Sequence, residues 1–454
     1  MTIVYSIEDF KFRYPNSNQS IFISGKLEIN QGDVILLQGN SGSGKSTLLL
    51  ALKGIIPHLI NGKFSGKILF NQQDIITLSN TSQIGYLGQN PHNQIICETV
   101  YRELAFGLEN QCIQPEIIRQ KIDFYSNKFK ISHLLNCQIS NLSGGEKQKI
   151  NLLSILIMEP EVLLLDEPTA FLDPENALEV ITIIKEYSHK KTIIIVEHNI
   201  HYLSNLVNRI IQINAAGQVI QRDPSTTNFC PALIEQPCKN STAFNATKPL
   251  LQINNLNFAY KKQTPLLKNL QLNIYAGQII GILGKNGSGK SSLLQLISKI
   301  IPSKNSIFYK QQDISSIKPK EYWQRIALLW QNPENHFLYN SVKLEISPEN
   351  INQFNLINCT EQNPYCLSEG QKRRLSLAIT LKPDIELFLL DEPTFGQDLA
   401  NREKLASFIS MLTMSNKSFI IISHDIAFLQ SLTTEIYILD TCLHKYDNEK
   451  IYHD

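Results

Sequence analysis

The most restrictive feature of this sequence is that one long pattern occurs in it twice. The segment GDVILLQGNSGSGKSTLLLAL recurs as GQIIGILGKNGSGKSSLLQLI, and VLLLDEPTAFLD recurs as LFLLDEPTFGQD. Lys45 and Lys290 of the first pair are 245 residues apart, whereas Asp166 and Asp391 of the second pair are 225 apart. We therefore predict two domains of one kind, since 454 residues is long for a single domain.

The second copy is shorter than the first in one place. Gln89 to Ser143 spans 54 residues, whereas the matching interval from Gln331 to Ser368 spans 37, so 17 residues are missing. The first copy has a stretch from about Gln114 to Leu134 in which apolar residues recur at helical spacing. We expect this amphipathic helix to be the part that the second copy lacks.

Both copies have the pattern of a mixed α/β fold. Each opens with a β-rich stretch, followed by a strand, a glycine-rich loop, a helix and a helical insert. Later strands such as VLLLD and TIIIV are continuously apolar, which favours a mostly parallel sheet covered on both faces. We predict two α/β phosphate-loop domains, residues 1–220 and 250–454, each with an antiparallel β subdomain and a helical subdomain that is shortened in the second. A polar, proline-containing linker, residues 221–249, joins them.

The glycine-rich loops carry the most specific chemical signal. GNSGSGKS and GKNGSGKS both match the pattern G-x-x-x-x-G-K-[ST], placed between a strand and a helix. Glycines let the backbone wrap phosphates with its N–H groups, and the positive end of the helix faces the same anion. Each lysine would neutralise β and γ phosphates, and the serine after it would bind Mg²⁺. The predicted nucleotide-binding residues of the loops are Gly39, Asn40, Ser41, Gly42, Ser43, Gly44, Lys45, Ser46 and Thr47, and Gly284, Lys285, Asn286, Gly287, Ser288, Gly289, Lys290, Ser291 and Ser292.

Two adjacent carboxylates follow an apolar strand in each copy. Asp166 and Asp391 end these strands and would hold Mg²⁺ beside the phosphate loop. Glu167 and Glu392 come next and are candidate general bases for an attacking water. An Asp-Glu pair at a strand end is commonly only a solvated surface feature, but the following Pro-Thr and the spacing from the lysine favour catalysis.

A histidine and a glutamine complete the candidate set in each copy. His198 and His424 follow another apolar strand, where a lone histidine is more often a core residue; here each could sense the γ phosphate or orient the water. Gln89 and Gln331 precede Asn-Pro at the entrance to the helical insert, so nucleotide state could reach a partner through them. The predicted Mg²⁺ ligands are Ser46, Gln89 and Asp166 in the first copy and Ser291, Gln331 and Asp391 in the second.

Two further segments, LSGGE and LSEGQ, resemble the signature of ABC ATPases. Alone, Ser-Gly-Gly would indicate no more than a helix N-cap. With the other motifs in order, the resemblance covers nearly the whole chain. It implies that two cassettes pair head to tail, so that the signature of one closes the ATP site of the other. The implied nucleotide contacts are Ser143, Gly144 and Gly145, and Ser368 and Gly370; Glu369 and Glu146 depart from the common signature.

The same resemblance gives roles to residues outside these motifs. Tyr14 and Tyr260 resemble the aromatic residue that stacks on adenine in the family, although each could be an ordinary tyrosine in a turn. Asp173 and Asp398 resemble its interface aspartate. Because every catalytic position is present in both copies, we expect two hydrolytic sites.

Composition limits the function classes. The net charge of +1 gives no bulk attraction to nucleic acid, and no nucleic-acid partner is expected. No apolar run approaches the ~18–20 residues that span a bilayer, and the first residues lack a signal-peptide pattern. We therefore expect a cytoplasmic protein whose membrane role depends on other subunits.

The segments after Gln89 and Gln331 resemble one group of ABC ATPases more closely. QNPHNQIICETVYRELAFGLEN, QNPENHFLYNSVKLEI and LSEGQKRRLSLAI are similar to the ATPases of energy-coupling-factor importers of vitamins and metal ions. That resemblance implies a transmembrane scaffold, a separate substrate-binding membrane subunit, and a place on the inner face of the cell membrane. The alternatives are a soluble tandem ABC ATPase acting on ribosomes or nucleic acid, and a tandem sugar importer, in which one site is typically degraded.

Overall fold

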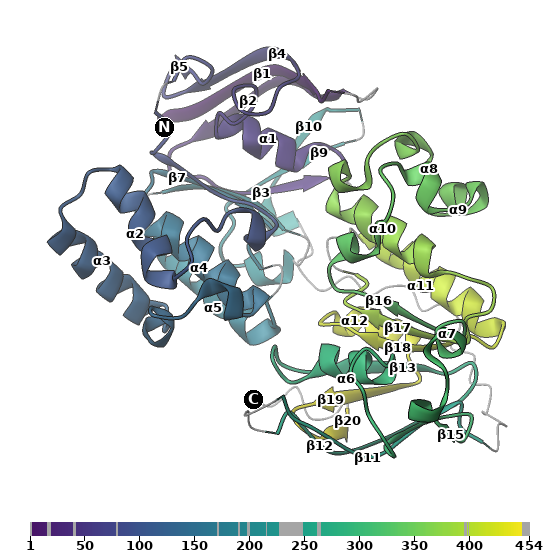
Figure 1. Ribbon diagram of the computed structural model, residues 1–454. Helices are drawn as coiled ribbons and strands as arrows, with labels where there is room; N and C mark the ends of the chain where they lie inside the picture. The colour runs from purple at the N-terminus through teal and green to yellow at the C-terminus, as the bar shows by residue number, and fades with distance from the viewer. Residues whose placement is uncertain are drawn as a thin grey trace. The chain divides into compact units, whose positions relative to one another are not determined.

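The computed structural model (Figure 1) places most of the chain. It describes residues 2–15, 20–39, 42–78, 80–169, 172–188, 191–197, 200–214, 216–226, 248–260, 265–394, 397 and 399–446. The chain divides into two compact units, Met1–Pro231 and Ala232–Asp454. Among the described residues, no helix combines the length and the apolar character that crossing a membrane requires.

The first unit contains two sheets. The antiparallel sheet has the order β2-β1-β4-β5 and the larger sheet the order β10-β9-β3-β8-β7-β6, in which all neighbours except β10 and β9 are parallel. Their strands are β1 Ile3–Arg13, β2 Ile21–Asn30, β4 Lys63–Phe70, β5 Gln73–Asp74, β3 Val34–Gly39, β6 Ile84–Leu87, β7 Val162–Asp166, β8 Thr192–Val196, β9 Arg209–Ile213 and β10 Val219–Arg222. The helices are α1 Lys45–Leu52, α2 Val100–Asn110, α3 Pro115–Lys128, α4 Gly144–Leu156 and α5 Pro174–Tyr187.

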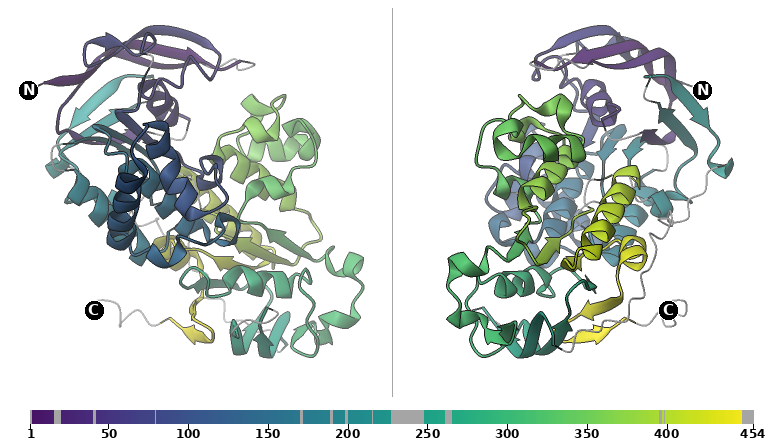
Figure 2. Two further views of the ribbon diagram at one scale, coloured as in Figure 1. Left: turned by 60° about the vertical axis from the view of Figure 1, so that its left-hand side comes forward. Right: turned by 90° about the vertical axis from the view of Figure 1, so that its right-hand side faces the viewer.

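The larger sheet lies between two apolar cores, which explains why its strands are apolar at every position. Along β7, Leu163 and Leu165 pack into the core formed with α2, α4 and α5, whereas Leu164 packs into the core shared with α1 and the antiparallel sheet. A strand buried on both faces cannot alternate polar and apolar residues. Figure 2 shows these layers from two further sides. The predicted α/β fold with parallel central strands is confirmed.

The second unit repeats this architecture. Its antiparallel sheet has the order β12-β11-β14-β15, and its larger sheet has the order β16-β17-β18-β13-β19-β20. The strands are β11 Leu251–Phe258, β12 Leu267–Ile274, β14 Ile307–Tyr309, β15 Gln312–Asp313, β13 Ile279–Leu283, β16 Ile326–Leu329, β17 Leu387–Asp391, β18 Ser418–Ile422, β19 Glu435–Leu439 and β20 Leu443–Lys445. The helices are α6 Lys290–Ile297, α7 Pro319–Tyr322, α8 Val342–Glu345, α9 Pro348–Gln353, α10 Glu369–Thr380, α11 Leu399–Met414 and α12 Ile426–Leu432.

The position of the missing residues differs from the expectation. The amide of Val100 donates to the carbonyl of Cys137, and the amide of Val342 donates to that of Gln362, so α8 matches the first turn of α2. The same 225-residue offset that relates Cys137 to Gln362 places α9 opposite residues 123–128, the end of α3. The second unit therefore lacks the later part of α2, the following turn and the first part of α3, about residues 104–121.

The end of α3 is retained for a packing reason. Ile131 and Leu134 are buried in the helical core of the first unit, and their equivalents Leu356 and Cys359 are buried in the second. Losing them would leave cavities beside the signature helix, and such cavities are destabilising. The helix predicted near Gln114 is present as α3, but the prediction that the second copy lacks all of it is wrong.

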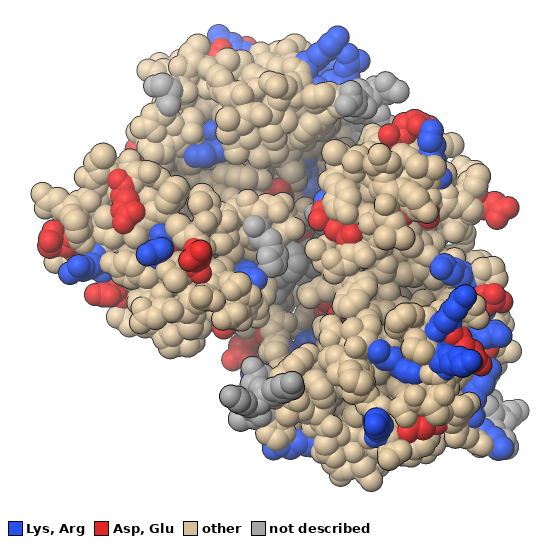
Figure 3. Space-filling model, in the orientation of Figure 1, with Lys and Arg blue, Asp and Glu red and all other residues tan. Residues whose placement is uncertain are grey.

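The surface in view is largely uncharged, with charges in scattered groups (Figure 3). Lys and Arg gather most closely on the second unit, around α7 and β15. Lys310, just before β15, and Arg325, just after α7, both pair with Glu386, at 2.7 and 3.5 Å. Ion pairing of this kind offsets part of the local positive charge.

Candidate functional site: two nucleotide-binding centres

The first phosphate loop connects β3 to α1. Gly44 caps α1 with φ of +93°, a conformation that favours glycine, and a Cβ there would overlap the Ile21 side chain. The Lys45 ammonium is buried and donates to the carbonyl of Gly39 at 2.7 Å, which folds the lysine back over the loop. The sequence thus builds a narrow cradle with one cation inside it.

The second loop, between β13 and α6, has the same geometry. Gly289 has φ of +97°, and a Cβ there would lie 2.9 Å from Leu266. The Lys290 ammonium donates to the carbonyls of Gly284 and Lys285 at 2.6 and 2.8 Å. Both loops therefore place a buried lysine at the amino end of a helix, as the motif predicts.

A tyrosine lies beside each phosphate loop. The Tyr14 hydroxyl is 3.1 Å from Oγ1 of Thr47, and the Tyr260 hydroxyl is 3.0 Å from Oγ of Ser292. Thr47 and Ser292 are the third residues of α1 and α6, each directly after the serine that follows the lysine, so the contacts are equivalent. This position next to the loop is what an adenine-stacking role requires, and that role stays a prediction.

The adjacent carboxylates end the central strands β7 and β17. Asp166 and Asp391 are buried, and the Ser291 hydroxyl donates to Oδ2 of Asp391 at 2.7 Å. Glu167 and Glu392 both have positive φ, 53° and 50°, which bends the chain sharply after the strand. Backbone hydrogen bonds hold both bends, from Glu167 to Val196 at 2.8 Å and from Glu392 to Ile422 at 2.9 Å.

In the second unit the structure also brings the histidine to the glutamate. The His424 amide donates to Oε2 of Glu392 at 3.2 Å, and its Nε2 is 3.5 Å from Oε1. The same Nε2 is 3.2 Å from Oδ1 of Asn286 in the phosphate loop.

The two carboxylates of the second unit have raised pKa values. Burial raises the pKa of Glu392 to about 7, although the positive charge of Lys290 acts to lower it. Burial likewise raises the pKa of Asp391 to about 6, and the hydrogen bond from Ser291 opposes only part of this rise. A carboxyl with a pKa near neutrality suits a general base.

The signature segments form helix N-termini. Ser143 caps α4 and Ser368 caps α10, each by a capping box with the third helical residue. The partner is Glu146 in the first unit and Gln371 in the second, which accept from the serine amides at 2.8 and 2.9 Å. Glu146, the departure noted in the sequence, is therefore an equivalent capping residue. Gly144, Gly145 and Gly370 lie in the first turns of these helices.

The two glutamines lie at the ends of β6 and β16. Gln89 is half-buried and Gln331 exposed, and no hydrogen bond joins either side-chain amide to another described residue. Asn40 and Ser41 of the first loop, His198 and the interface candidate Asp398 lie outside the described residues. Their roles stay predictions.

Comparison with known proteins decides the family. The model of the family described as ABC transporter matches residues 24–170 and 267–395, more than half of the chain. The chain belongs to the ABC transporter family. It is 30% identical to a Bacillus subtilis protein named as an HMP/thiamine import ATP-binding protein, over 96% of this chain and 89% of that one. It is 33% identical to an ABC transporter ATP-binding protein of Sulfurisphaera tokodaii, over 95% of both chains.

Solved structures add support for the fold. The archaeal ribosome recycling factor in a complex with a ribosomal stalk protein has a TM-score of 0.63 and 17% identity, over 96% of this chain and 89% of that chain. The RNase-L inhibitor has a TM-score of 0.64 and 17% identity, over 96% and 90%. At this identity the likeness establishes the duplicated ABC fold alone. As a member of the family, the chain is an ATPase that uses ATP with Mg²⁺.

The residues of both cassettes fit Mg-ATP. Gly44 and Gly289 have φ of +93° and +97°, the left-handed conformation that lets successive backbone N–H groups of such a loop turn toward a phosphate. The pair of Ser291 hydroxyl and Asp391 carboxylate is the oxygen donor set that Mg²⁺ prefers. Ser46 and Asp166 hold the same positions in the first unit.

Three features of these cassettes escaped sequence reasoning. Glu103 accepts from the amides of Ile96 and Cys97 at 3.0 and 2.7 Å, and Glu345 accepts from Leu338 and Tyr339 at 2.6 and 2.7 Å. These glutamates fix the segment that follows each glutamine. The signal was present as the shared spacing of Val-x-x-Glu in TVYRE and SVKLE.

The other two features distinguish the halves. Buried Arg373 on α10 donates to the carbonyls of Trp330 and Gln331, both at 2.7 Å, whereas its equivalent Gln148 is buried without a hydrogen bond from its amide to any described residue. Buried Glu197 accepts from the amide and hydroxyl of Thr169 at 3.2 and 2.6 Å, where the second unit has Ser423. The sequence alone gave no contact partner for these residues.

The raised pKa values of the second unit predict a pH dependence of stability. An acid whose folded pKa exceeds its unfolded value favours folding while it is protonated. For the nucleotide-free protein we expect the stability of the second unit to fall as pH rises from about 4.5 toward about 7, the ordinary and raised pKa values of Glu392. Urea unfolding followed by tryptophan fluorescence measures this unit alone, because Trp323 and Trp330 are the two tryptophans of the chain. Glu392→Gln should flatten the dependence; an unchanged slope in that variant would contradict it.

Proposed function

We propose that this chain is the ATP-hydrolysing subunit of a membrane importer of the energy-coupling-factor type, with a vitamin or metal ion as cargo. It would lie on the cytoplasmic, inner face of the membrane, bound to a transmembrane scaffold and a substrate-binding membrane subunit. The observation that carries the proposal is the likeness over 96% of the chain to a protein named for HMP/thiamine import. The segments after Gln89 and Gln331 add support from the sequence.

Within each cassette we assign roles from position. Lys45 and Lys290 bind the phosphates, and Glu167 and Glu392 accept a proton from the attacking water, with His198 and His424 orienting it. Ser46, Gln89 and Asp166, and Ser291, Gln331 and Asp391, would hold Mg²⁺, which neutralises charge on the phosphates. The capping of α4 and α10 by serine supports a phosphate-facing role for both signatures.

We also propose that residues 1–220 and 250–454 are the functional domains and that they pair head to tail. Each signature would then complete the ATP site of the other half. ATP would favour the closed pair through its differential affinity for that state, and hydrolysis would release it. The division of the compact units at Pro231 falls within the segment proposed as the linker.

The alternative is a soluble tandem ABC ATPase that acts on ribosomes or nucleic acid. The likeness to the ribosome recycling factor concerns the fold alone, at 17% identity. Sedimentation of a native lysate separates the two functions. We expect the chain to sediment with membranes. Mild detergent should then extract it as a complex with membrane subunits. ATP-dependent sedimentation of the chain with ribosomes would overturn the importer proposal.

The longer insert of the first unit gives a prediction specific to transport. Joining Glu103 to Ile122 through one residue, as in the second unit, removes the extra part of α2 and α3. Ile131 and Leu134 remain in the core beside α4, whereas Leu104, Leu108 and Ile118 of the same core are removed, so thermal unfolding of the variant serves as a folding control. We expect transport to fall more than ATP hydrolysis of the chain in solution. Uptake by membrane vesicles and phosphate release measure the two; equal losses would contradict the prediction.

A further inference from the structure

Each half of the chain has one carboxylate beside its histidine, but on opposite sides of it. In TIIIVEHN, Glu197 precedes the histidine, whereas in FIIISHDI, Asp425 follows it. At the exchanged positions the halves have the uncharged residues Asn199 and Ser423. The two halves therefore cannot hold the segment around the histidine by the same charged contacts.

In the first half, Glu197 binds the segment that follows the proposed base. Its side chain is buried, and its carboxylate accepts from the amide and the hydroxyl of Thr169, two residues after Glu167. The Glu167 amide itself donates to the carbonyl of Val196, the residue before Glu197. Neighbouring residues of one segment thus hold the chain at Glu167 and just after it, and the contacts of the carboxylate are charge-assisted.

In the second half, Arg402 on α11 makes the equivalent connection. Its Nη1 donates to Oδ2 of Asp425 at 2.9 Å, and its Nε donates to the carbonyl of Gln397 at 3.0 Å. Gln397 lies five residues after Glu392, so the arginine joins the histidine segment to the segment that follows the proposed base. The charged side chains are 16% and 18% exposed, so water competes little for this pair. A planar guanidinium suits the role because it donates in two directions at once.

Asp425 carries this connection to the histidine. Its amide donates to Oγ of Ser423 at 3.1 Å, and its carboxylate also caps α12. His424, between these two residues, donates its own amide to Glu392. Contacts therefore fix the backbone on both sides of this histidine, and Arg402 acts on it through Asp425.

Neither half has the contacts of the other. Ala177 is the equivalent of Arg402 and is buried in the helical core of the first unit, and its methyl group cannot donate a hydrogen bond. Ser423 is the equivalent of Glu197, and its hydroxyl is 3.2 Å from the Thr394 hydroxyl, an uncharged contact in place of two with a carboxylate. Removing Glu197 or Arg402 should thus disturb mainly the half that contains it.

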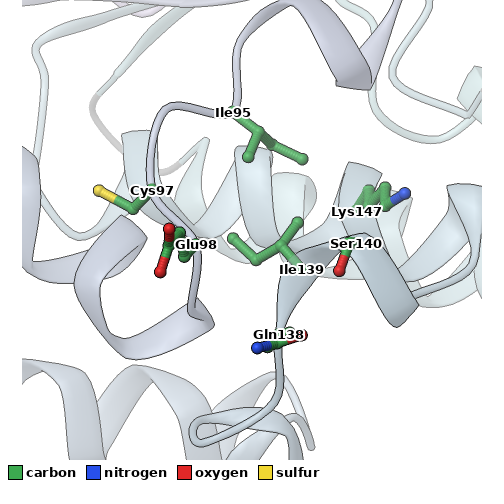
Figure 4. A pocket seen from close by; sticks show the side chains of 7 residues that line it. All are labelled: Ile95, Cys97, Glu98, Gln138, Ile139, Ser140 and Lys147. Atoms are coloured by element: carbon green, nitrogen blue, oxygen red, sulfur yellow. The ribbon is translucent and has the colours of Figure 1, made fainter.

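The contacts of Glu197 are separate from the surface pocket of the first unit. That pocket is formed by the segment after Gln89, the residues just before α4, and Lys147 (Figure 4), and neither Glu197 nor Thr169 belongs to its wall. A change at Glu197 should leave this pocket as it is, so we expect its effect in the ATP site.

We infer that Glu197 in the first half and Arg402 in the second are positioning residues, which hold the histidine and the catalytic glutamate of their own half in register for hydrolysis. The inference rests on the roles proposed for Glu167, Glu392 and the two histidines. Because the phosphate loops bind ATP without these contacts, their loss should weaken the transition state more than the binding of ATP.

Trapping with ADP, Mg²⁺ and vanadate tests each half of the full chain separately. Vanadate adopts the geometry of the transferred phosphate, and ultraviolet light then cleaves the chain at the phosphate loop that holds it. Fragments cut near Ser46 and near Ser291 differ in length, so a gel gives the ratio of cleavage at the two loops. In Glu197→Ala we expect the share of the first loop to fall by roughly tenfold relative to the second, and Arg402→Met should shift the ratio by a similar factor in the other direction. Binding of a fluorescent ATP analogue should stay nearly unchanged.

Arg209→Met is the matched control for the loss of a buried arginine. Arg209 also binds one carboxylate and one carbonyl, those of Asp33 and Glu28, and the side chains of its ion pair are 19% and 16% exposed. It lies at the amino end of β9, whereas the phosphate loop follows the carboxyl end of the neighbouring parallel strand β3. The cleavage ratio should therefore not change in this variant.

A double variant tests the contact of the first half. Thr169→Val removes the hydroxyl that donates to Glu197. Because Glu197→Ala has already broken this contact, adding Thr169→Val should shift the cleavage ratio little further. Independent, additive shifts would mean that Glu197 does not act through Thr169, and would contradict the inference.

The outcomes separate the inference from the proposed roles. If the unaltered chain is not cleaved at both loops, the roles proposed for the two sites fail, and the inference fails with them. If both loops are cleaved but either Glu197→Ala or Arg402→Met leaves the ratio unchanged, the inference is wrong and the roles stand. A loss of ATP binding by the same factor as cleavage would also overturn it, because it would show a general structural defect.

Discussion

Replacing Glu167 and Glu392 together with glutamine is expected to reduce ATP hydrolysis by about 10²–10⁴-fold, the usual effect of removing a general base. Both carboxylates are held at sharp bends after β7 and β17 by backbone hydrogen bonds. The raised pKa of Glu392 means that its carboxylate holds a proton more tightly than an ordinary glutamate. Glutamine keeps the size of the side chain but cannot accept the proton, so ATP should still bind.

Phosphate release and binding of a fluorescent ATP analogue measure the two properties. The control is the double variant Glu109→Gln with Glu349→Gln, which makes the same charge change at exposed positions of α2 and α9. It should hydrolyse ATP at the normal rate. Turnover near the normal rate in the Glu167 and Glu392 variant would refute the assignment of the base. Loss of binding as well would point to a structural role.

Replacing Arg373 with methionine is expected to destabilise the second unit by about 3 kcal/mol. The guanidinium donates to the carbonyls of Trp330 and Gln331 inside the protein, and a charged hydrogen bond contributes about 1.5–3 kcal/mol. Methionine fills similar space but leaves both carbonyls without that donor. The segment carrying Gln331 would then separate from α10, and hydrogen exchange at both elements should quicken.

Gln148→Met on α4 is the matched control for this prediction. The Gln148 amide is buried without a hydrogen-bond partner among the described residues, so an apolar replacement removes a desolvation cost. We expect exchange in α4 to stay the same or to slow. If Arg373→Met and Gln148→Met changed exchange equally, the hydrogen bonds of Arg373 would not explain its effect.

The parts of the site that were predictable depend on local motifs. A glycine that must have positive φ, such as Gly44 or Gly289, and a lysine directly after it specify a phosphate loop without distant information. The parallel sheet was predictable because strands such as β7 are apolar at every position. The pairing of the Ser291 hydroxyl with Asp391 needed only the order of the motifs, since the carboxyl ends of parallel strands meet at one edge.

The remainder depends on contacts between distant segments. Whether position 148 or 373 carries a positive charge can be read from the sequence, but the carbonyls that it contacts lie about 40 residues earlier in the chain. The position of the deletion could not be predicted either. The sequence shows how many residues are missing, but which residues they are depends on which side chains form the core. Leu134 and its equivalent Cys359 differ in residue type, so similarity did not reveal that both are buried.

The left-handed bends at Glu167 and Glu392 have a consequence for how the two halves can evolve. A residue with a side chain in this conformation costs about 1 kcal/mol relative to glycine, and both copies bear that cost at the same place. Selection for stability alone would favour glycine at either position, at the expense of the proposed base. On the role proposed for these glutamates, their presence in both halves reflects selection for ATP hydrolysis at both sites, and in relatives a glycine at either position would mark a half that no longer hydrolyses ATP.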